Sequence, residues 1–182
     1  MRRVTMAAVA ILALSAMAGC KKKQATQYVD DGNAQLAIAV RVADPKTAIQ
    51  LVRGFYDVED NAWRWTAPKF AVTLRPPNDV APEGAKLFLE YAVPDLFLQK
   101  VPETTLTVTV GGKALAPEKI QKAGAGRLER LAPAELLKSD MVTVEFSLDK
   151  YLEAGSVDQR ELGLIVSAVG FQTGQAAASP AK

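Results

Sequence analysis

The chain has 182 residues, of which 49% are hydrophobic and 23% are charged, and its formal net charge is +2. This composition is typical of one globular domain with a single core, and it argues against a disordered chain or a nucleic-acid binder. The sequence contains no histidine and one cysteine. These counts exclude Ser-His-Asp and Cys-His catalysis, histidine-ligated metal sites and an intrachain disulfide.

Residues 1–19 have the pattern of a secretory signal peptide. Arg2 and Arg3 form a short positive region, and an uncharged, mostly apolar stretch follows at residues 4–19. A retained transmembrane helix would need about 20 apolar residues, so this stretch is too short for one. The arginine pair lacks the flanking residues usual in twin-arginine export. We therefore expect residues 1–19 to be cleaved.

The signal ends in Met17, Ala18, Gly19 and Cys20, and this tetrapeptide resembles a bacterial lipobox. The resemblance implies that Cys20 carries a diacylglyceryl group and becomes the N-terminus of the mature protein. Membrane lipid is then the first expected partner, because two or more acyl chains anchor a protein stably. A buried free cysteine is the alternative. Since Lys21 rather than aspartate follows the anchor, we expect a cell-envelope protein at the outer membrane.

The exported chain divides into three parts. Residues 20–33 comprise the lipidated cysteine and a polar, flexible tether, residues 34–172 a β-sandwich domain, and residues 173–182 a disordered tail of small and polar residues. The three lysines at 21–23 either lie among anionic headgroups or belong to a solvated leash. Arg2 and Arg3 account for the whole net charge, so the exported part is neutral.

The domain is dominated by alternation of apolar and polar residues, which predicts half-buried strands. The strands are expected at residues 35–42, 70–75, 86–93, 104–110 and 141–148, and an apolar segment at 161–171 is expected to be a central strand covered on both faces. Short helical turns are expected at 117–123, 133–139 and 149–155. This pattern predicts an all-β fold, a single antiparallel β-sandwich of jelly-roll type.

Both tryptophans of the chain lie in the aromatic and charged segment 53–66. In an extended strand Trp63 and Trp65 point to one side and Arg64 to the other, so the indoles can form a flat platform for a sugar ring. Tyr56, Glu59 and Arg64 would then hold its hydroxyl groups. Alternatively, the tryptophans fill the core and Arg64 lies over an aromatic ring or pairs with Glu59. We expect Trp63 to contact a ligand and Trp65 to be structural.

A second segment, residues 158–163, leads into the expected central strand. Asp158 and Arg160 share one side of an extended backbone and are expected to form a structural ion pair. The alternative is that Arg160 binds an anion. Gly163 predicts a close approach by another part of the chain, such as one of the tryptophans.

These two segments share a set of residues with a known family. The matching residues are Gly54, Phe55, Tyr56, Glu59, Arg64, Trp65 and Thr66 in the first segment, and Asp158, Arg160, Leu162 and Gly163 in the second. On these residues the sequence resembles the β-sandwich domains found beside bacterial glycosyltransferases and in other cell-surface polysaccharide proteins, and the resemblance implies a carbohydrate-binding-like domain over residues 49–171. We expect this domain to stand alone, without the glycosyltransferase domain of the family pattern.

Three classes of function remain. Asp57, Glu59, Asp60 and Glu90 leave room for carboxylate catalysis, and the first three for a loop calcium site, but nothing in their spacing supports either. We therefore expect a non-catalytic protein with no cofactor, no metal and no nucleic-acid partner. A binding module for glycan or envelope polymer is the favoured reading. A structural or assembly lipoprotein that binds another envelope protein is the alternative.

Overall fold

The computed structural model describes residues 36–172. The predictions for the signal peptide, Cys20, the tether and the tail lie outside these residues. No helix within 36–172 is long and apolar enough to cross a membrane. The helical elements are short: η1 (Pro45–Gln50), α1 (Asp95–Lys100) and η2 (Ala134–Leu136). The strands are β1 (Ala39–Arg41), β2 (Leu51–Glu59), β3 (Trp63–Leu74), β4 (Ala85–Val93), β5 (Thr104–Val110), β6 (Lys113–Ala114), β7 (Glu118–Ile120), β8 (Gly124–Ala132), β9 (Val142–Leu148) and β10 (Ile165–Phe171).

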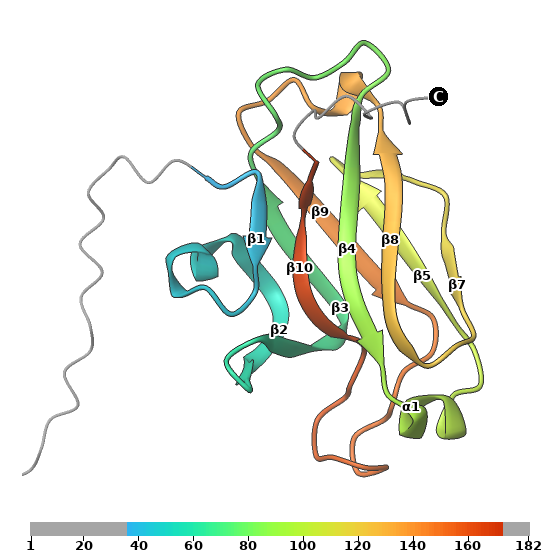
Figure 1. Ribbon diagram of the computed structural model, residues 1–182. Coiled ribbons are helices and arrows are strands. Elements are labelled where there is room, and N and C mark those ends of the chain that lie inside the picture. Colours follow the sequence, from blue (N-terminus) through green and yellow to red (C-terminus); the bar gives the residue numbers. More distant parts are fainter. Residues whose placement is uncertain (1–35, 173–182) are drawn as a thin grey trace, which may run out of the picture. The chain divides into compact units, whose positions relative to one another are not determined.

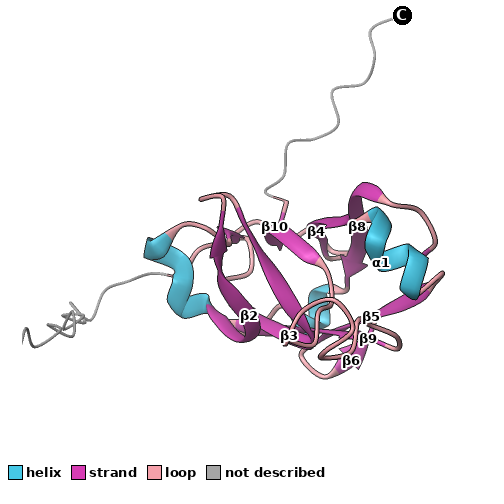
Figure 2. Cartoon of the chain, turned by 90° about the horizontal axis from the view of Figure 1, so that it is seen from below, coloured by secondary structure: helices cyan, strands magenta, loops and turns pink. Residues whose placement is uncertain are grey.

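The strands form two antiparallel layers that share β3. One layer has the order β6-β5-β9-β3, and the other continues as β3-β10-β4-β8. Figure 2 looks along the strands and shows β10, β4 and β8 in one layer and β3, β9 and β5 in the other. In Figure 1 the same layers lie one behind the other. The prediction of an all-β antiparallel sandwich is confirmed.

The core lies between the layers and follows the alternation of the sequence. Leu106, Val108 and Val110 of β5 are fully buried, while the residues between them are partly or fully exposed. Phe70 of β3 and Phe146 of β9 stack with ring centroids 4.7 Å apart. Burial of each such side chain stabilises the fold by about 1.5–3 kcal/mol. The burial of these side chains is therefore the main contribution that holds the two layers together.

β3 passes from one layer to the other. Trp65 pairs with Ile165 of β10, whereas Phe70 pairs with Phe146 of β9. Pro68 lies between these two pairings, and proline has no N–H for a continuous ladder. The register against β2 shifts at the same place. This crossing puts the first half of β3, with both tryptophans, in the β10 layer.

Gly54 lies where β2 follows this bend. Its φ is +73°, a left-handed value that other residues rarely adopt, and a Cβ here would overlap the Lys69 carbonyl oxygen and lie 2.7 Å from Phe70 Cα. The backbones of β2 and β3 therefore approach each other in a way that only glycine permits.

Several local predictions are wrong. Residues 149–155 form no helix, because the Asp149 carboxylate accepts hydrogen bonds from the Thr105 N–H (2.6 Å) and the Thr104 hydroxyl (3.0 Å) rather than capping its own segment. Residues 117–123 contain β7, which pairs with β5, and 133–139 contain only η2. The strand expected from residue 161 begins at Ile165, because Leu162 forms an isolated bridge with Leu152. Three further strands, β2, β6 and β8, were not predicted.

Candidate binding surface on the β2–β3 hairpin

The aromatic and charged segment forms a hairpin. The turn between β2 and β3 has two residues with positive φ, Asp60 at 51° and Asn61 at 54°, and the Ala62 N–H donates to the Glu59 carbonyl over 3.1 Å. Both positive φ values are those of a type I′ turn, whose twist matches a β-hairpin, and Asp and Asn tolerate this conformation better than most residues. The turn sets Glu59 directly opposite Trp63.

The two indoles lie on the same face of β3 but do not form a flat platform. Their ring centroids are 6.4 Å apart and their planes meet at 84°, an edge-to-face arrangement. Both side chains are half-buried. Trp65 belongs to the half-buried side chains that pack against the core, and Trp63 does not. The surface therefore presents one indole, supported from the side by the other.

The loop before β10 adds a charged network to this face. The Arg160 guanidinium donates to the Asp158 carboxylate over 2.9 and 3.0 Å and to Glu59 Oε1 over 3.2 Å, and it lies 5.0 Å from the centroid of the Tyr56 ring. The Tyr56 hydroxyl donates to the Glu161 carbonyl at 2.7 Å. Arg160 thus joins two segments that are far apart in the sequence. The sequence suggests Arg64 for a place over an aromatic ring or beside Glu59, and in the structure Arg160 makes both contacts.

The charged groups of this network stabilise one another's ionised forms. Hydrogen bonds from the Arg160 side chain and backbone N–H hold the pKa of the Asp158 carboxyl at about 2, and the Asp158 carboxylate in turn raises the pKa of Arg160. The three charged side chains are each about one-third exposed. Within residues 36–172, no hydrogen bond occupies Glu59 Oε2. A fixed carboxylate oxygen at the surface is an acceptor ready for a ligand hydroxyl.

Arg64 lies on the opposite face of β3. Its Nε donates to the Val42 carbonyl at 2.7 Å and its Nη1 to the Tyr56 carbonyl at 2.6 Å. Two donors of the guanidinium are therefore used to tie Val42, which follows β1, to Tyr56 of β2. Of the five ligand-contact candidates, the structure gathers Tyr56, Glu59, Trp63 and Trp65 around the hairpin, and it employs Arg64 as a clamp between strands.

Gly163 approaches Thr66 rather than a tryptophan, which corrects the prediction. A Cβ at Gly163 would lie 2.7 Å from Thr66 Oγ1 and 2.8 Å from the Ala67 carbonyl oxygen. The buried Thr66 hydroxyl accepts a hydrogen bond from the Leu164 N–H at 3.0 Å. This close contact fixes the end of the loop on β3, and the loop carries Arg160 to its place beside Glu59.

The carboxylates considered for catalysis or calcium have separate surroundings. Asp57 and Asp60 are exposed, Glu59 is paired with Arg160, and Glu90 is paired with Arg127 on the neighbouring strand β8. Within residues 36–172, no group of three or more acidic or cysteine side chains is arranged to hold a metal ion.

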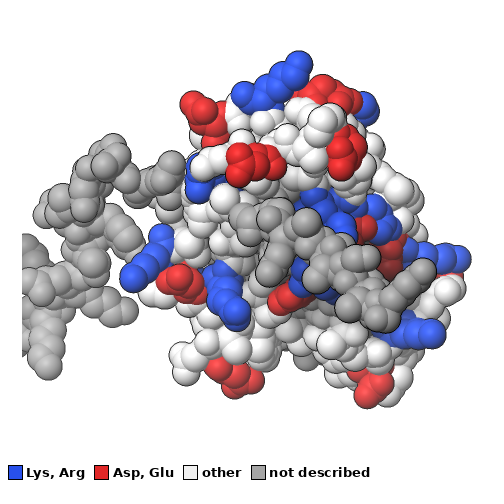
Figure 3. All heavy atoms as spheres, turned by 45° about the horizontal axis from the view of Figure 1, so that its top comes forward, with Lys and Arg blue, Asp and Glu red and all other residues white. Residues whose placement is uncertain are grey.

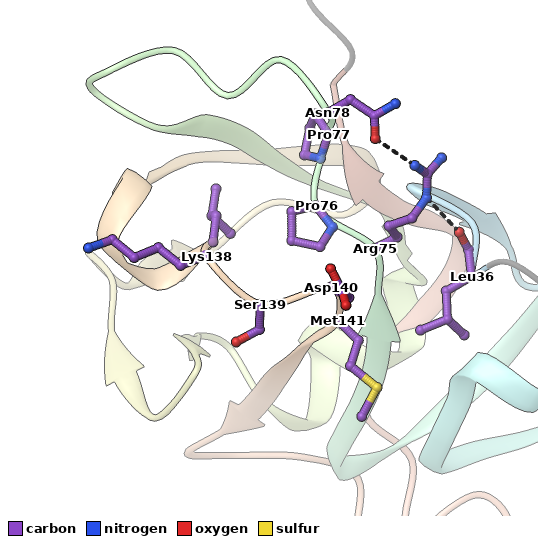
Figure 4. Close-up of a pocket in the computed structure, with 10 residues that line it drawn as sticks. Leu36, Arg75, Pro76, Pro77, Asn78, Lys138, Ser139, Asp140 and Met141 are labelled. Carbon is purple, nitrogen blue, oxygen red and sulfur yellow. Dashed lines mark hydrogen bonds between the residues drawn. The ribbon is translucent and has the colours of Figure 1, made fainter.

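A groove at the other end of the sandwich was not foreseen from the sequence. It has a volume of about 450 Å³ and lies between the segment from Arg75 to Asn78 and the segment from Leu137 to Met141. Figure 4 shows Arg75 on one wall, hydrogen-bonded to Leu36 and Asn78, and Ser139 and Asp140 on the other. In Figure 3 acidic and basic side chains are interspersed over this end of the domain. The only sequence feature that marks the groove is the turn at Pro76 and Pro77, and such a turn indicates a change of chain direction rather than a binding site.

No family model matches the chain, and a search of curated proteins finds no similar sequence. Among solved structures, an exo-β-1,3-galactanase from Phanerochaete chrysosporium aligns with 75% of this chain at 11% identity and a TM-score of 0.42, and this chain spans only 29% of that enzyme. CsCBM6-3 from Clostridium stercorarium, solved with cellobiose, aligns over 76% of this chain and 95% of its own length at 9% identity and a TM-score of 0.41. The CBM36-1 domain of a multidomain xylanase from the hindgut metagenome of Trinervitermes trinervoides aligns over 67% of this chain and 87% of its own length, at 8% identity and a TM-score of 0.36.

Proposed function

We propose that this protein is a non-catalytic, glycan-binding β-sandwich held at the cell envelope by a lipid on Cys20. The observation that carries the binding proposal is the hairpin surface, where the half-buried Trp63 indole stands opposite Glu59. An indole stacks on the apolar C–H face of a sugar ring, and a fixed carboxylate accepts hydrogen bonds from its hydroxyl groups. Arg160, which lies over the Tyr56 ring, holds Glu59 in position before any ligand arrives.

The binding proposal predicts that Trp63→Ala lowers glycan affinity by about tenfold, roughly 1.4 kcal/mol, because one stacking surface is lost. Folding should survive, because Trp63 does not pack against the core. The measurement is glycan-array binding followed by titration calorimetry on the glycan that binds best, with thermal unfolding of the same samples.

A suitable control is Phe88→Ala, which removes another half-buried aromatic side chain that does not pack against the core, on β4 beneath Arg127. Its affinity should equal that of the parent protein. Parent protein that binds no glycan on the array, or a Trp63→Ala variant with unchanged affinity, would count against the hairpin as a sugar site.

The anchoring proposal rests on the lipobox-like residues 17–20. Cys20→Ser removes the only thiol that can carry the diacylglyceryl group, so the protein should move from the membrane fraction to the soluble fraction. Cell fractionation and metabolic labelling with palmitate measure this change. Lys21→Ala serves as the control and should remain in the membrane and labelled. A Cys20→Ser protein that stays in the membrane with unchanged mobility would contradict the proposal.

A second candidate function is assembly with another envelope protein, and one observation favours it. Ile49 near the end of η1 and Val52 near the start of β2 are 82% and 55% exposed, and within residues 36–172 β2 pairs with β3 alone. Apolar side chains beside an edge strand suit a protein partner. A photocrosslinker at Val52 that captures one envelope protein in cells, combined with no glycan binding in vitro, would favour assembly over glycan binding.

A further inference from the structure

Three grooves on the layer made by β5, β9 and β3 adjoin one another. The first is the groove of Figure 4, with a volume of about 450 Å³, which lies between residues 75–78 and residues 137–141. Ser139 and Met141 line it and also line a second groove of about 550 Å³ beside the Gly111-Gly112 turn. Glu145 lines this second groove and a third one of about 240 Å³ on the outer face of the sheet. The shared residues make one continuous track.

The track is long. From Met141 to Ser147 it follows β9, and six residues of a strand cover about 20 Å. The loop groove extends it further at the Met141 end. A ligand that fills the track is therefore an extended chain of several units rather than one small molecule.

The lining of the track suits a ligand with many hydroxyl groups. Arg53 and the Thr109 hydroxyl hold the Glu145 carboxylate from two sides. Arg75 uses Nε on the Leu36 carbonyl (3.0 Å) and Nη1 on Asn78 (2.8 Å), so within residues 36–172 its Nη2 has no partner. Further hydroxyl groups come from Ser139 and Thr143 in the second groove and from Thr107 and Ser147 in the third.

The track carries both signs of charge, with four basic and three acidic side chains. Arg53, Lys69, Arg75 and Lys138 lie along it with Glu135, Asp140 and Glu145. Mixed donors and acceptors recognise a neutral polyhydroxylated chain better than a strongly anionic one, which would meet the carboxylates. Met141 is 61% exposed at the centre and offers an apolar surface to the C–H side of a sugar ring.

An extended peptide is a poorer fit. β9 is already hydrogen-bonded to β5 on one side and to β3 on the other, so no strand can be added along the track. A ligand in the track would therefore be bound by side chains and not by the backbone of β9. We infer that this track is a second binding site, for a neutral polysaccharide chain, on the layer opposite to the one that carries Trp63. The inference shares its ligand class with the proposed function and uses different residues.

The test is affinity gel electrophoresis of the exported protein in gels that contain a mixed-linkage β-glucan, a galactan or a mannan. Disaccharides of the same sugars serve as competitors. At least one polysaccharide should retard the protein, and its disaccharide should compete weakly. The double variant Met141→Ala/Glu145→Gln should lose at least fivefold in affinity for that polysaccharide, whereas Trp63→Ala should retain it.

Leu96→Ala/Glu103→Gln is the matched control. It removes an exposed apolar side chain on α1 and a carboxylate ion-paired with Lys119, with similar exposed fractions, and it should behave like the parent. Thermal unfolding should change little and equally in the two double variants, since the apolar residues are 61% and 47% exposed and the two carboxylates 42% and 40%.

The outcomes separate the two sites. Retardation that is unaffected by the Met141 and Glu145 changes, or abolished by Trp63→Ala alone, would overturn the track and leave the hairpin site standing. Short sugars that bind through Trp63 while no polysaccharide retards the protein would do the same. Retardation that depends on Met141 and Glu145, with no effect of Trp63→Ala on any glycan, would support the track and contradict the hairpin proposal. No binding to any glycan would overturn both.

Discussion

Gly54→Ala is expected to lower the free energy of unfolding by about 3–5 kcal/mol, a large part of the stability of a typical domain. Two costs add at this position. A left-handed φ of +73° costs a residue with a Cβ about 1–2 kcal/mol. The new Cβ would also overlap the Lys69 carbonyl oxygen and press on Phe70 Cα, and both are backbone atoms that cannot rotate away. Chemical denaturation followed by tryptophan fluorescence measures the change.

Gly112→Ala is the matched control for this prediction. Gly112 has a φ of +84° in the β5–β6 turn, but nothing lies within 4 Å of the position of its Cβ. It should therefore incur the conformational cost alone, about 1–2 kcal/mol. Equal losses in the two variants would show that the close approach of β2 to β3 does not strain a side chain at residue 54.

Trp65→Ala is expected to cost about 2–4 kcal/mol of unfolding free energy. Trp65 packs against the core, stands edge-on to Trp63 and occupies the pairing position opposite Ile165 of β10. Deleting a large aromatic side chain loses its buried area and leaves a cavity; full burial would cost about 3–5 kcal/mol, and half-burial less. The measurement is denaturant unfolding monitored by circular dichroism, since one fluorophore is removed.

Trp63→Ala provides the comparison, with an expected loss below about 1.5 kcal/mol, because it gives up mainly the edge-to-face contact. A larger loss for Trp63 than for Trp65 would reverse the roles assigned to the two indoles, and the ligand-contact role would then pass to Trp65.

Alternation predicted the strands that have one face in the core, because burial imposes a period of two directly on the sequence. β5 is the clearest case, with Leu106, Val108 and Val110 inward and threonines between them. β2 was missed because its register against β3 shifts three times, which breaks the alternation. β8 was missed because it begins with Gly124-Ala125-Gly126 and carries charges, a pattern typical of a loop.

The candidate site was predictable only where its contacts are local. Asp158 and Arg160 lie two residues apart, and their ion pair could be anticipated from this spacing, although they lie in a loop rather than in an extended strand. The bond from Arg160 to Glu59 joins residues 101 positions apart and depends on how the loop sits on β3. The angle between the two indoles depends on side-chain packing, which a strand pattern does not specify. The track was missed because its lining comes from loops and strands that are far apart in the sequence, and a strand pattern does not show which of them meet.

The pairing of the last strand has a consequence for how the chain folds. β10 bonds to β1, β3 and β4, so strands from the first half of the domain remain incomplete until the final segment is available. A chain that emerges from the ribosome N-terminus first can form the β2–β3 hairpin early, but it cannot close that layer of the sandwich. Such long-range closure slows folding and leaves β-strand edges open to aggregation in the meantime. The edges of β1, β3 and β4 that pair with β10 therefore stay open until residues 165–171 are available.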